Sequence, residues 1–181
     1  MKVGIKKNKF LNLHLGLSPY YKGNATNFWP FINNELEFLG STILHIDSGI
    51  DTGDIIFQEK LSIDTQDTAG SLHDKLMHLG AHLVVKTWQA IASNTAPNES
   101  QESILANHQW TLDTLKHAPK IFKNDCQIDW QLPASSIAAK IKGLSPYPSA
   151  TSLLNNLNLK IYEASILAET PDKAAGTMDT D

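Results

Sequence analysis

The feature that most limits the fold of this chain is a long amphipathic segment near its middle. Apolar side chains recur there at the spacing of one helix face: Leu72, Leu76, Leu79, Leu83 and Ala90, with Val84, Trp88 and Ile91 widening the stripe. Thr65, Asp67 and Thr68 offer N-cap chemistry, so we predict a helix from this point to about Ser93. A helix of about 38 Å, at about 1.5 Å per residue, is long enough to cover the face of a sheet.

Strand patterns precede this helix. Residues 10–15 alternate apolar and polar side chains, residues 40–46 are rich in β-branched side chains, and residues 55–63 form a third strand pattern. A short helix ending at Leu36 is predicted between the first two strands. Together they predict a βαβ-like unit, which would bring the loops after both strands to one edge of the sheet.

The second half of the chain has its own pattern. We predict a polar linker at residues 94–103, a loop with a short strand at 118–130, a helix from Pro133 to Leu144 and a hairpin at 151–167 with its turn at 155–158. The whole chain has 181 residues, of which 41% are hydrophobic and 19% charged, so it is long enough for one domain and part of a second.

Charge and cysteine content narrow the class of protein. The formal net charge of −4 does not indicate a nucleic-acid binder, although a local basic patch is compatible with it. The single cysteine, Cys126, rules out an intrachain disulfide. No signal-peptide pattern or membrane-length apolar run is present, so a soluble cytoplasmic protein is expected.

Two polar side chains share one side of the first strand. Asn12 and His14 are two residues apart, so both point the same way. An amide can donate to a developing oxyanion, and an imidazole can move a proton near neutral pH. The alternative is a polar pair that caps the end of a strand.

The loop DSGIDTGD at residues 47–54 carries three acidic side chains between glycines. In the βαβ-like arrangement, Asp51 would lie beside His14. The same loop also fits an Asp-rich turn or a calcium site, although it lacks the acid spacing and the terminal Glu of an EF-hand.

Three separated motifs resemble the folate-dependent formyltransferase family. They are NLH at 12–14, SPYYKG at 18–23 and GSTILHIDSGIDTGDI at 40–55. Within the family, residues 67–84 and the segments APKIFKNDCQIDW and IKGLSPYPSA are similar to the methionyl-tRNA formyltransferases.

The resemblance implies formyl transfer from 10-formyltetrahydrofolate to the amino group of methionyl-initiator tRNA. The family's catalytic residues fall on Asn12, His14 and Asp51. Its folate-contacting residues fall on two loops: Gly16, Leu17, Ser18, Pro19, Asp47, Ser48, Gly49, Ile50 and Thr52. Asn12 and a protonated His14 would stabilise the oxyanion, and Asp51 would raise the pKa of His14. No metal is expected, because hydrogen-bond donors supply the polarisation.

The resemblance also implies an α/β fold. Residues 1–117 would be the C-terminal half of a Rossmann-like catalytic domain, and residues 118–181 a linker and the start of a tRNA-binding, OB-like barrel domain. The chain looks truncated at both ends relative to the family. We therefore expect a free strand edge, an uncovered apolar face, and weak or no activity from this chain alone. A monomer is expected.

Some residues favour other functions. GNATNFWPF and His45 are similar to sugar-nucleotide N-formyltransferases of the same family, and Gly16 and Lys22 replace a hydroxyl residue and an Arg of the methionyl-tRNA enzymes. A third alternative is an inactive fragment or a tRNA-binding piece.

Overall fold

The computed structural model describes residues 10–108, 111–168 and 173–178. The strands are β1 (Leu11–His14), β2 (Lys22–Gly23), β3 (Gly40–His45), β4 (Ile55–Lys60), β5 (His117–Ala118), β6 (Ala150–Leu154) and β7 (Leu157–Ile161). The α-helices are α1 (Trp29–Ile32), α2 (Ala69–Ala92), α3 (Gln101–Asn107) and α4 (Ala134–Leu144). Three 3-10 helices lie at Leu36–Phe38, Leu112–Thr114 and Lys123–Cys126.

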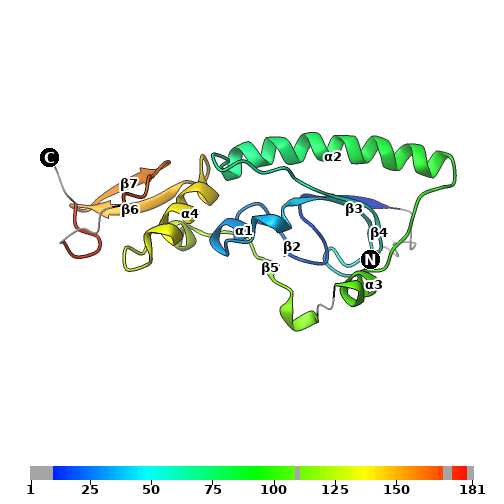
Figure 1. The fold of residues 1–181 in the computed structure, drawn as a ribbon, viewed down its shortest axis with the longest axis horizontal. Helices are drawn as coiled ribbons and strands as arrows, with labels where there is room; N and C mark the ends of the chain where they lie inside the picture. Colours follow the sequence, from blue (N-terminus) through cyan, green and yellow to red (C-terminus); the bar gives the residue numbers. More distant parts are fainter. Residues whose placement is uncertain (1–9, 109–110, 169–172, 179–181) are drawn as a thin grey trace, which may run out of the picture.

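Helix α2 confirms the predicted long helix and lies across the three-stranded sheet (Figure 1). Thr68 caps it by accepting a hydrogen bond from the Ser71 backbone, and the Ser71 hydroxyl accepts one from Thr68. Its buried side follows the helical period: Ala69, Leu72, Leu76, Gly80, Leu83 and Thr87. Gly80 packs directly on β1, since a Cβ there would lie 2.9 Å from Leu13 Cδ2. The lack of a side chain thus lets the helix approach the sheet closely.

The prediction that Val84, Trp88 and Ile91 widen the buried stripe is wrong. Trp88 is 73% exposed, and Val84 and Ile91 are also exposed. With Met77 and Val85 they form what we call the outer stripe of α2. By helical geometry this stripe lies next to Gly80 on the helix surface, and Gly80 packs on β1. Lys86 lies on the opposite flank of the helix, over the ring of Phe57 of β4.

The sheet has the order β1-β3-β4, and both pairs are antiparallel. In the described part of the chain β1 therefore has one free edge, as expected. The predicted βαβ-like unit is wrong, because β1 and β3 run in opposite directions, with His14 opposite Thr42. The physical reason is the short connection. Helix α1 has only four residues and packs on α4 and the start of α2, so it does not cross over the sheet.

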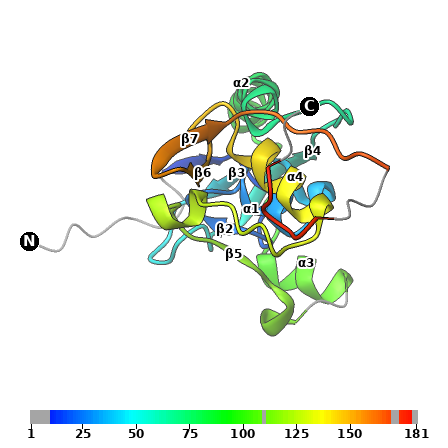
Figure 2. The same cartoon turned by 90° about the vertical axis from the view of Figure 1, so that its left-hand side faces the viewer.

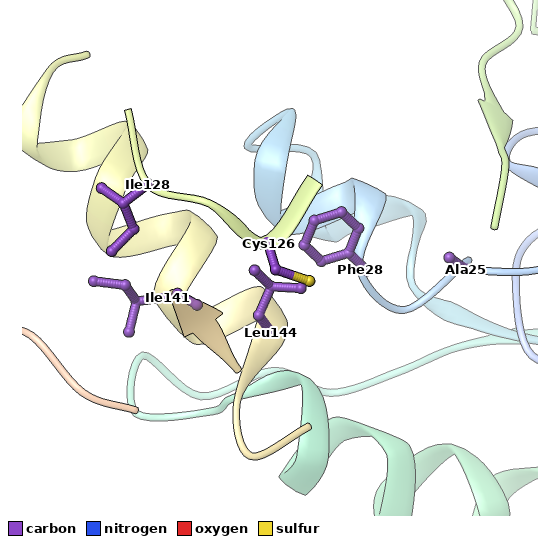
Figure 3. Close-up of a cluster of buried hydrophobic side chains, with 7 residues drawn as sticks. Ala25, Phe28, Cys126, Ile128, Ile141 and Leu144 are labelled. Atoms are coloured by element: carbon purple, nitrogen blue, oxygen red, sulfur yellow. The ribbon is translucent and has the colours of Figure 1, made fainter. Parts of the chain in front are cut away.

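The second half of the chain joins the first through a common core. Phe28 from the segment before α1 packs with Cys126, Ile141 and Leu144 (Figure 3). The helix predicted from Pro133 is confirmed as α4. The predicted hairpin is also confirmed, although its turn is confined to residues 155–156 and its second strand ends at Ile161.

Helix α3 is a feature that the sequence did not predict. It begins inside the predicted polar linker, where Ser100 accepts a hydrogen bond from the Ser103 backbone. It lies on the side of the sheet opposite α2 (Figure 2). In the part of the chain that the structure describes, no helix is both long and apolar enough to cross a bilayer.

Candidate active site

The carboxylate of Asp51 is the centre of the candidate site. Its Oδ1 atom accepts a hydrogen bond of 3.0 Å from Asn12 Nδ2, and its Oδ2 atom accepts one of 3.1 Å from the Gly23 backbone N–H. Oδ2 also lies 3.4 Å from His14 Nδ1. The structure thus brings the three predicted catalytic residues together.

Asp51 reaches this position by a different route from the one predicted. Because β3 runs antiparallel to β1, it ends beside Leu11, at the far end of β1 from His14. The loop after β3 then folds back over the sheet face that carries Asn12 and His14. Asp51 has a φ of 52°, a left-handed conformation that is uncommon outside glycine.

The imidazole of His14 is almost fully buried. Its Nε2 atom is also buried and has no hydrogen-bond partner in the described part of the chain. Gly16 packs against this atom, since a Cβ there would lie 2.7 Å from it. With Nδ1 directed at the Asp51 carboxylate, we assign the ring proton to Nδ1, which leaves Nε2 as a proton acceptor.

Asp51 raises the pKa of His14, as expected, but the expected protonated ring is wrong, because the net change in this pKa is downward. Burial lowers this pKa from its ordinary value of 6.5, because the low-dielectric surroundings disfavour the charged ring. The Asp51 carboxylate and the backbone of Tyr21 raise the pKa but offset only part of the burial effect, and the positive charge of Lys22 lowers it further. His14 is therefore neutral at pH 7.

The predicted folate-contacting loop at residues 47–52 lines a small cavity next to these residues. The cavity has a volume of about 180 Å³ and is lined by Asn12, Leu44, His45, Ile46, Asp47, Gly49, Ile50, Asp51 and Thr52. Asp47 fixes the loop from within, because its Oδ1 atom accepts from Gly49 N at 2.9 Å and from Thr52 Oγ1 at 2.6 Å. The Thr52 hydrogen bond is the main cause that lowers the pKa of Asp47. Ser48 is exposed, and Ile50 is 75% exposed.

The other predicted folate loop lies against the Nε2 side of His14 and is buried throughout: Gly16, Leu17, Ser18 and Pro19. Thr42 and Gln58 hold its backbone. Thr42 Oγ1 donates to Gly16 O at 2.6 Å, and Gln58 Nε2 donates to Ser18 O at 2.6 Å and to Thr42 Oγ1 at 2.9 Å. The two predicted loops therefore enclose His14 from opposite sides.

Two residues at the site had no role in the sequence analysis. Gly23 belongs to the SPYYKG motif, and that motif is the signal that could have found it. Gln101 is buried, and its side-chain amide donates to the backbone carbonyls of Asp51 and Gly53. No motif in the sequence marks Gln101.

A larger groove begins next to the site. Its volume is about 920 Å³, and it runs from Asn24 past the first turn of α2 to Lys120 and Tyr147. Asn24 directly follows Gly23, whose N–H contacts Asp51. Within the described residues, no three His, Cys, Asp or Glu side chains are grouped in a way that could hold a metal ion.

Comparison with known sequences matches both halves of the chain to one family. Residues 3–88 match the family described as formyl transferase, and residues 120–181 match the one described as formyl transferase, C-terminal domain. A methionyl-tRNA formyltransferase from Bacteroides fragilis is 39% identical over an alignment of 175 residues, which covers 94% of this chain and 52% of that protein. One from Azobacteroides pseudotrichonymphae is 48% identical over 139 residues, 77% of this chain and 41% of that protein.

Solved structures share the fold. The N-formyltransferase from Helicobacter canadensis, in complex with folinic acid and dTDP-3-aminofucose, superposes with a TM-score of 0.70. It is 27% identical, and the match covers 90% of this chain and 56% of that one. Compared with the curated methionyl-tRNA formyltransferases described above, the chain spans about half of their length.

Proposed function

Because this chain belongs to the formyl transferase family, we propose that it transfers a formyl group from 10-formyltetrahydrofolate to the amino group of methionyl-initiator tRNA. The observation that carries the proposal is the convergence of Asn12, His14 and Asp51 at one point. Relatives at 35% to 48% identity that are named methionyl-tRNA formyltransferase support this acceptor.

The proposed chemistry follows from the three side chains. The methionyl nitrogen attacks the formyl carbon and forms the new C–N bond, while the bond to the folate nitrogen breaks. One amide N–H of Asn12 is bound to Asp51, and its second N–H is available to donate to the oxygen on which negative charge develops.

His14 and Asp51 carry the proton. The attacking amine must lose one proton and the departing folate nitrogen must gain one. Neutral His14 accepts the proton at Nε2, directly or through water, and returns it to the leaving nitrogen. Asp51 holds Nδ1 and stabilises the imidazolium while it carries the proton.

We propose that the folate donor is held by the loops at residues 16–19 and 47–52. The cavity between Asn12 and Thr52 supports this placement, because it opens beside the amide that would polarise the formyl group. The unpartnered Nε2 atom of His14 fits the same placement, since a buried acceptor without a partner is unfavourable unless a substrate or water satisfies it.

We also propose that residues 1–117 are part of the catalytic domain and residues 118–181 the linker and start of an OB-like, tRNA-binding domain. The match of residues 120–181 to the family's C-terminal domain supports this division. The groove between Asn24 and Tyr147 lies where the two parts meet and provides a path for a large acceptor. We place the protein in the cytoplasm and propose that the complete protein acts as a monomer.

A sugar-nucleotide N-formyltransferase is the second candidate. The Helicobacter canadensis structure, a complex with dTDP-3-aminofucose, favours it, because it matches 90% of this chain at a TM-score of 0.70. The lower identity of 27%, against 39% for the Bacteroides fragilis relative, places it second.

Two experiments test these proposals. Calorimetry with folinic acid, a stable analogue of the donor, should show saturable binding, and no heat at millimolar concentrations would favour an inactive fragment. Formyl transfer should then be measured with charged initiator tRNA and with a dTDP-amino sugar. Each acceptor is offered to this chain alone and to this chain joined to the part of the Bacteroides fragilis relative that it does not match, because the match covers 52% of that protein. If the protein formylated the dTDP-amino sugar but not the tRNA, the sugar-nucleotide N-formyltransferase proposal would replace the first one.

A further inference from the structure

We infer that Gln101 is a positioning residue, whose side-chain amide holds Asp51 in the backbone conformation that directs its carboxylate at Asn12 and His14. The inference rests on the proposed function only for what this carboxylate does in the reaction. The position of the carboxylate is a property of this chain and is measured separately.

Gln101 uses its side-chain nitrogen on the loop that carries Asp51. Nε2 donates to the carbonyl oxygen of Asp51 at 2.9 Å and to that of Gly53 at 2.7 Å. The residue is 5% exposed, so water competes little for these hydrogen bonds. The two N–H groups of one amide nitrogen thus hold the carbonyl groups of Asp51 and Gly53 together.

Asp51 needs such a restraint because its backbone is in an unfavourable region. Its φ of 52° is left-handed, a conformation that costs free energy for any residue with a Cβ. On the other side, Gly53 is pressed against β3, since a Cβ there would lie 1.8 Å from the His45 carbonyl oxygen. The loop is therefore held between β3 and Gln101.

The segment before α3 provides the rigid support for Gln101. Ile55 and Glu99 exchange two backbone hydrogen bonds, of 2.8 and 2.9 Å. Asn98 Nδ2 donates to Asp54 Oδ2 at 2.8 Å. These contacts fix residues 98–101 along the loop, and Gln101 is the residue of this segment whose side chain hydrogen-bonds to Asp51.

The test measures the ring of His14 in this chain by ¹⁵N NMR, with no folate or tRNA present. In the native protein the ring should be neutral and in the Nδ1–H tautomer at pH 7, because burial lowers the pKa of His14. In Gln101→Met, a side chain of similar length without donors, Asp51 is released and its contribution to the pKa of His14 is lost. We expect the pKa of His14 to fall below its native value and the tautomer to become mixed.

Asn98→Ala is the matched control, because it removes an amide donor from the same segment without touching Asp51. It should leave the tautomer and the pKa of His14 unchanged. Gln101→Asn is the second variant in case Gln101→Met does not fold. It keeps the polar amide but is one methylene too short to reach both carbonyls, so it should also lower the pKa of His14.

The inference is overturned if a folded Gln101 variant keeps the native pKa and tautomer of His14. It is also overturned if Asn98→Ala changes them as much. Failure of the proposed function has a different signature, since the native protein would then transfer no formyl group while the NMR result stands. In an active preparation, Gln101→Met should lower kcat at least 10-fold with little change in KM.

Discussion

The Nδ1 atom of His14 lies 3.4 Å from Oδ2 of Asp51, in a site where the imidazole is almost fully buried. Burial lowers the pKa of the imidazole, and the carboxylate opposes this effect without reversing it. The ring is thus kept neutral but ready to accept a proton.

Removal of the charge of Asp51 should make His14 still harder to protonate. In Asp51→Asn, the pKa of His14 should fall below its native value, because the carboxylate that raises it is gone. An NMR titration of the ring measures this directly. Asp54→Asn is the control, since Asp54 lies in the same loop but pairs with Asn98 and should leave the titration unchanged. An unchanged pKa in Asp51→Asn would show that the carboxylate contributes nothing to it.

Asn12 has a prediction of its own in the formylation assay. Asn12→Ala removes the donor proposed for the oxyanion, which should lower kcat by about 10²–10³-fold, as the loss of one such donor does in other enzymes. The KM for the acceptor should change little, because the lost interaction forms only in the transition state. A variant with near-native kcat would assign Asn12 to structure alone. The comparison variant is Asn98→Ala, whose amide lies outside the site.

Local patterns were enough to predict most of the fold. The capped, 3.6-periodic segment gave α2, and the period-two alternation put Asn12 and His14 on one face of β1. Strand direction was not predictable in this way, because it depends on where α1 packs. Helix α1 packs in one cluster with α4, which lies more than a hundred residues further along the chain. It packs in another cluster with α2, which begins about forty residues further along. The exposure of Trp88 was missed because periodicity places a side chain around a helix but does not say how far the sheet extends.

The residues that form the site were predictable from the sequence, but the protonation state of His14 was not. Asn12, His14 and Asp51 met as expected, although the antiparallel strands meant that the loop had to fold back. The pKa of His14 depends on burial by Gly16 and its neighbours, and burial follows from the packing of distant segments. Gln101 is 50 residues from Asp51 in sequence, so no local spacing could connect the two.

The pH dependence of stability should report the buried imidazole. Since the pKa of His14 is lowered on folding, the unfolded chain binds a proton more readily than the folded chain below about pH 6.5. Its contribution is therefore fully present above this pH and is lost as the pH falls through the folded pKa. Urea unfolding at several pH values should show a smaller loss on acidification in His14→Gln than in the native chain. An identical loss in both would contradict the buried, neutral state.

The reciprocal cap of α2 should contribute measurably to stability. Thr68→Ala removes the hydroxyl that accepts from Ser71 N, and loss of such a cap costs about 1 kcal/mol. The free energy of unfolding from urea titration measures this cost. Thr65→Ala serves as the control, since Thr65 is exposed three residues earlier and should change the stability by less than about 0.5 kcal/mol. Equal effects of the two substitutions would argue against the cap.

The outer stripe of α2 should drive association of this chain, because it presents a row of apolar side chains beside the edge of β1 that no described strand pairs with. Trp88 is 73% exposed, so Trp88→Gln should lower the association constant in sedimentation velocity while changing the free energy of unfolding by less than about 0.5 kcal/mol.

Leu83→Gln is the opposite case on the same helix. Leu83 is fully buried against the sheet, so this substitution should destabilise the fold by several kcal/mol. If Trp88→Gln left association unchanged, the contact between copies would have to lie elsewhere, with the β6–β7 hairpin and its exposed Leu153 and Leu157 as the next surface to substitute.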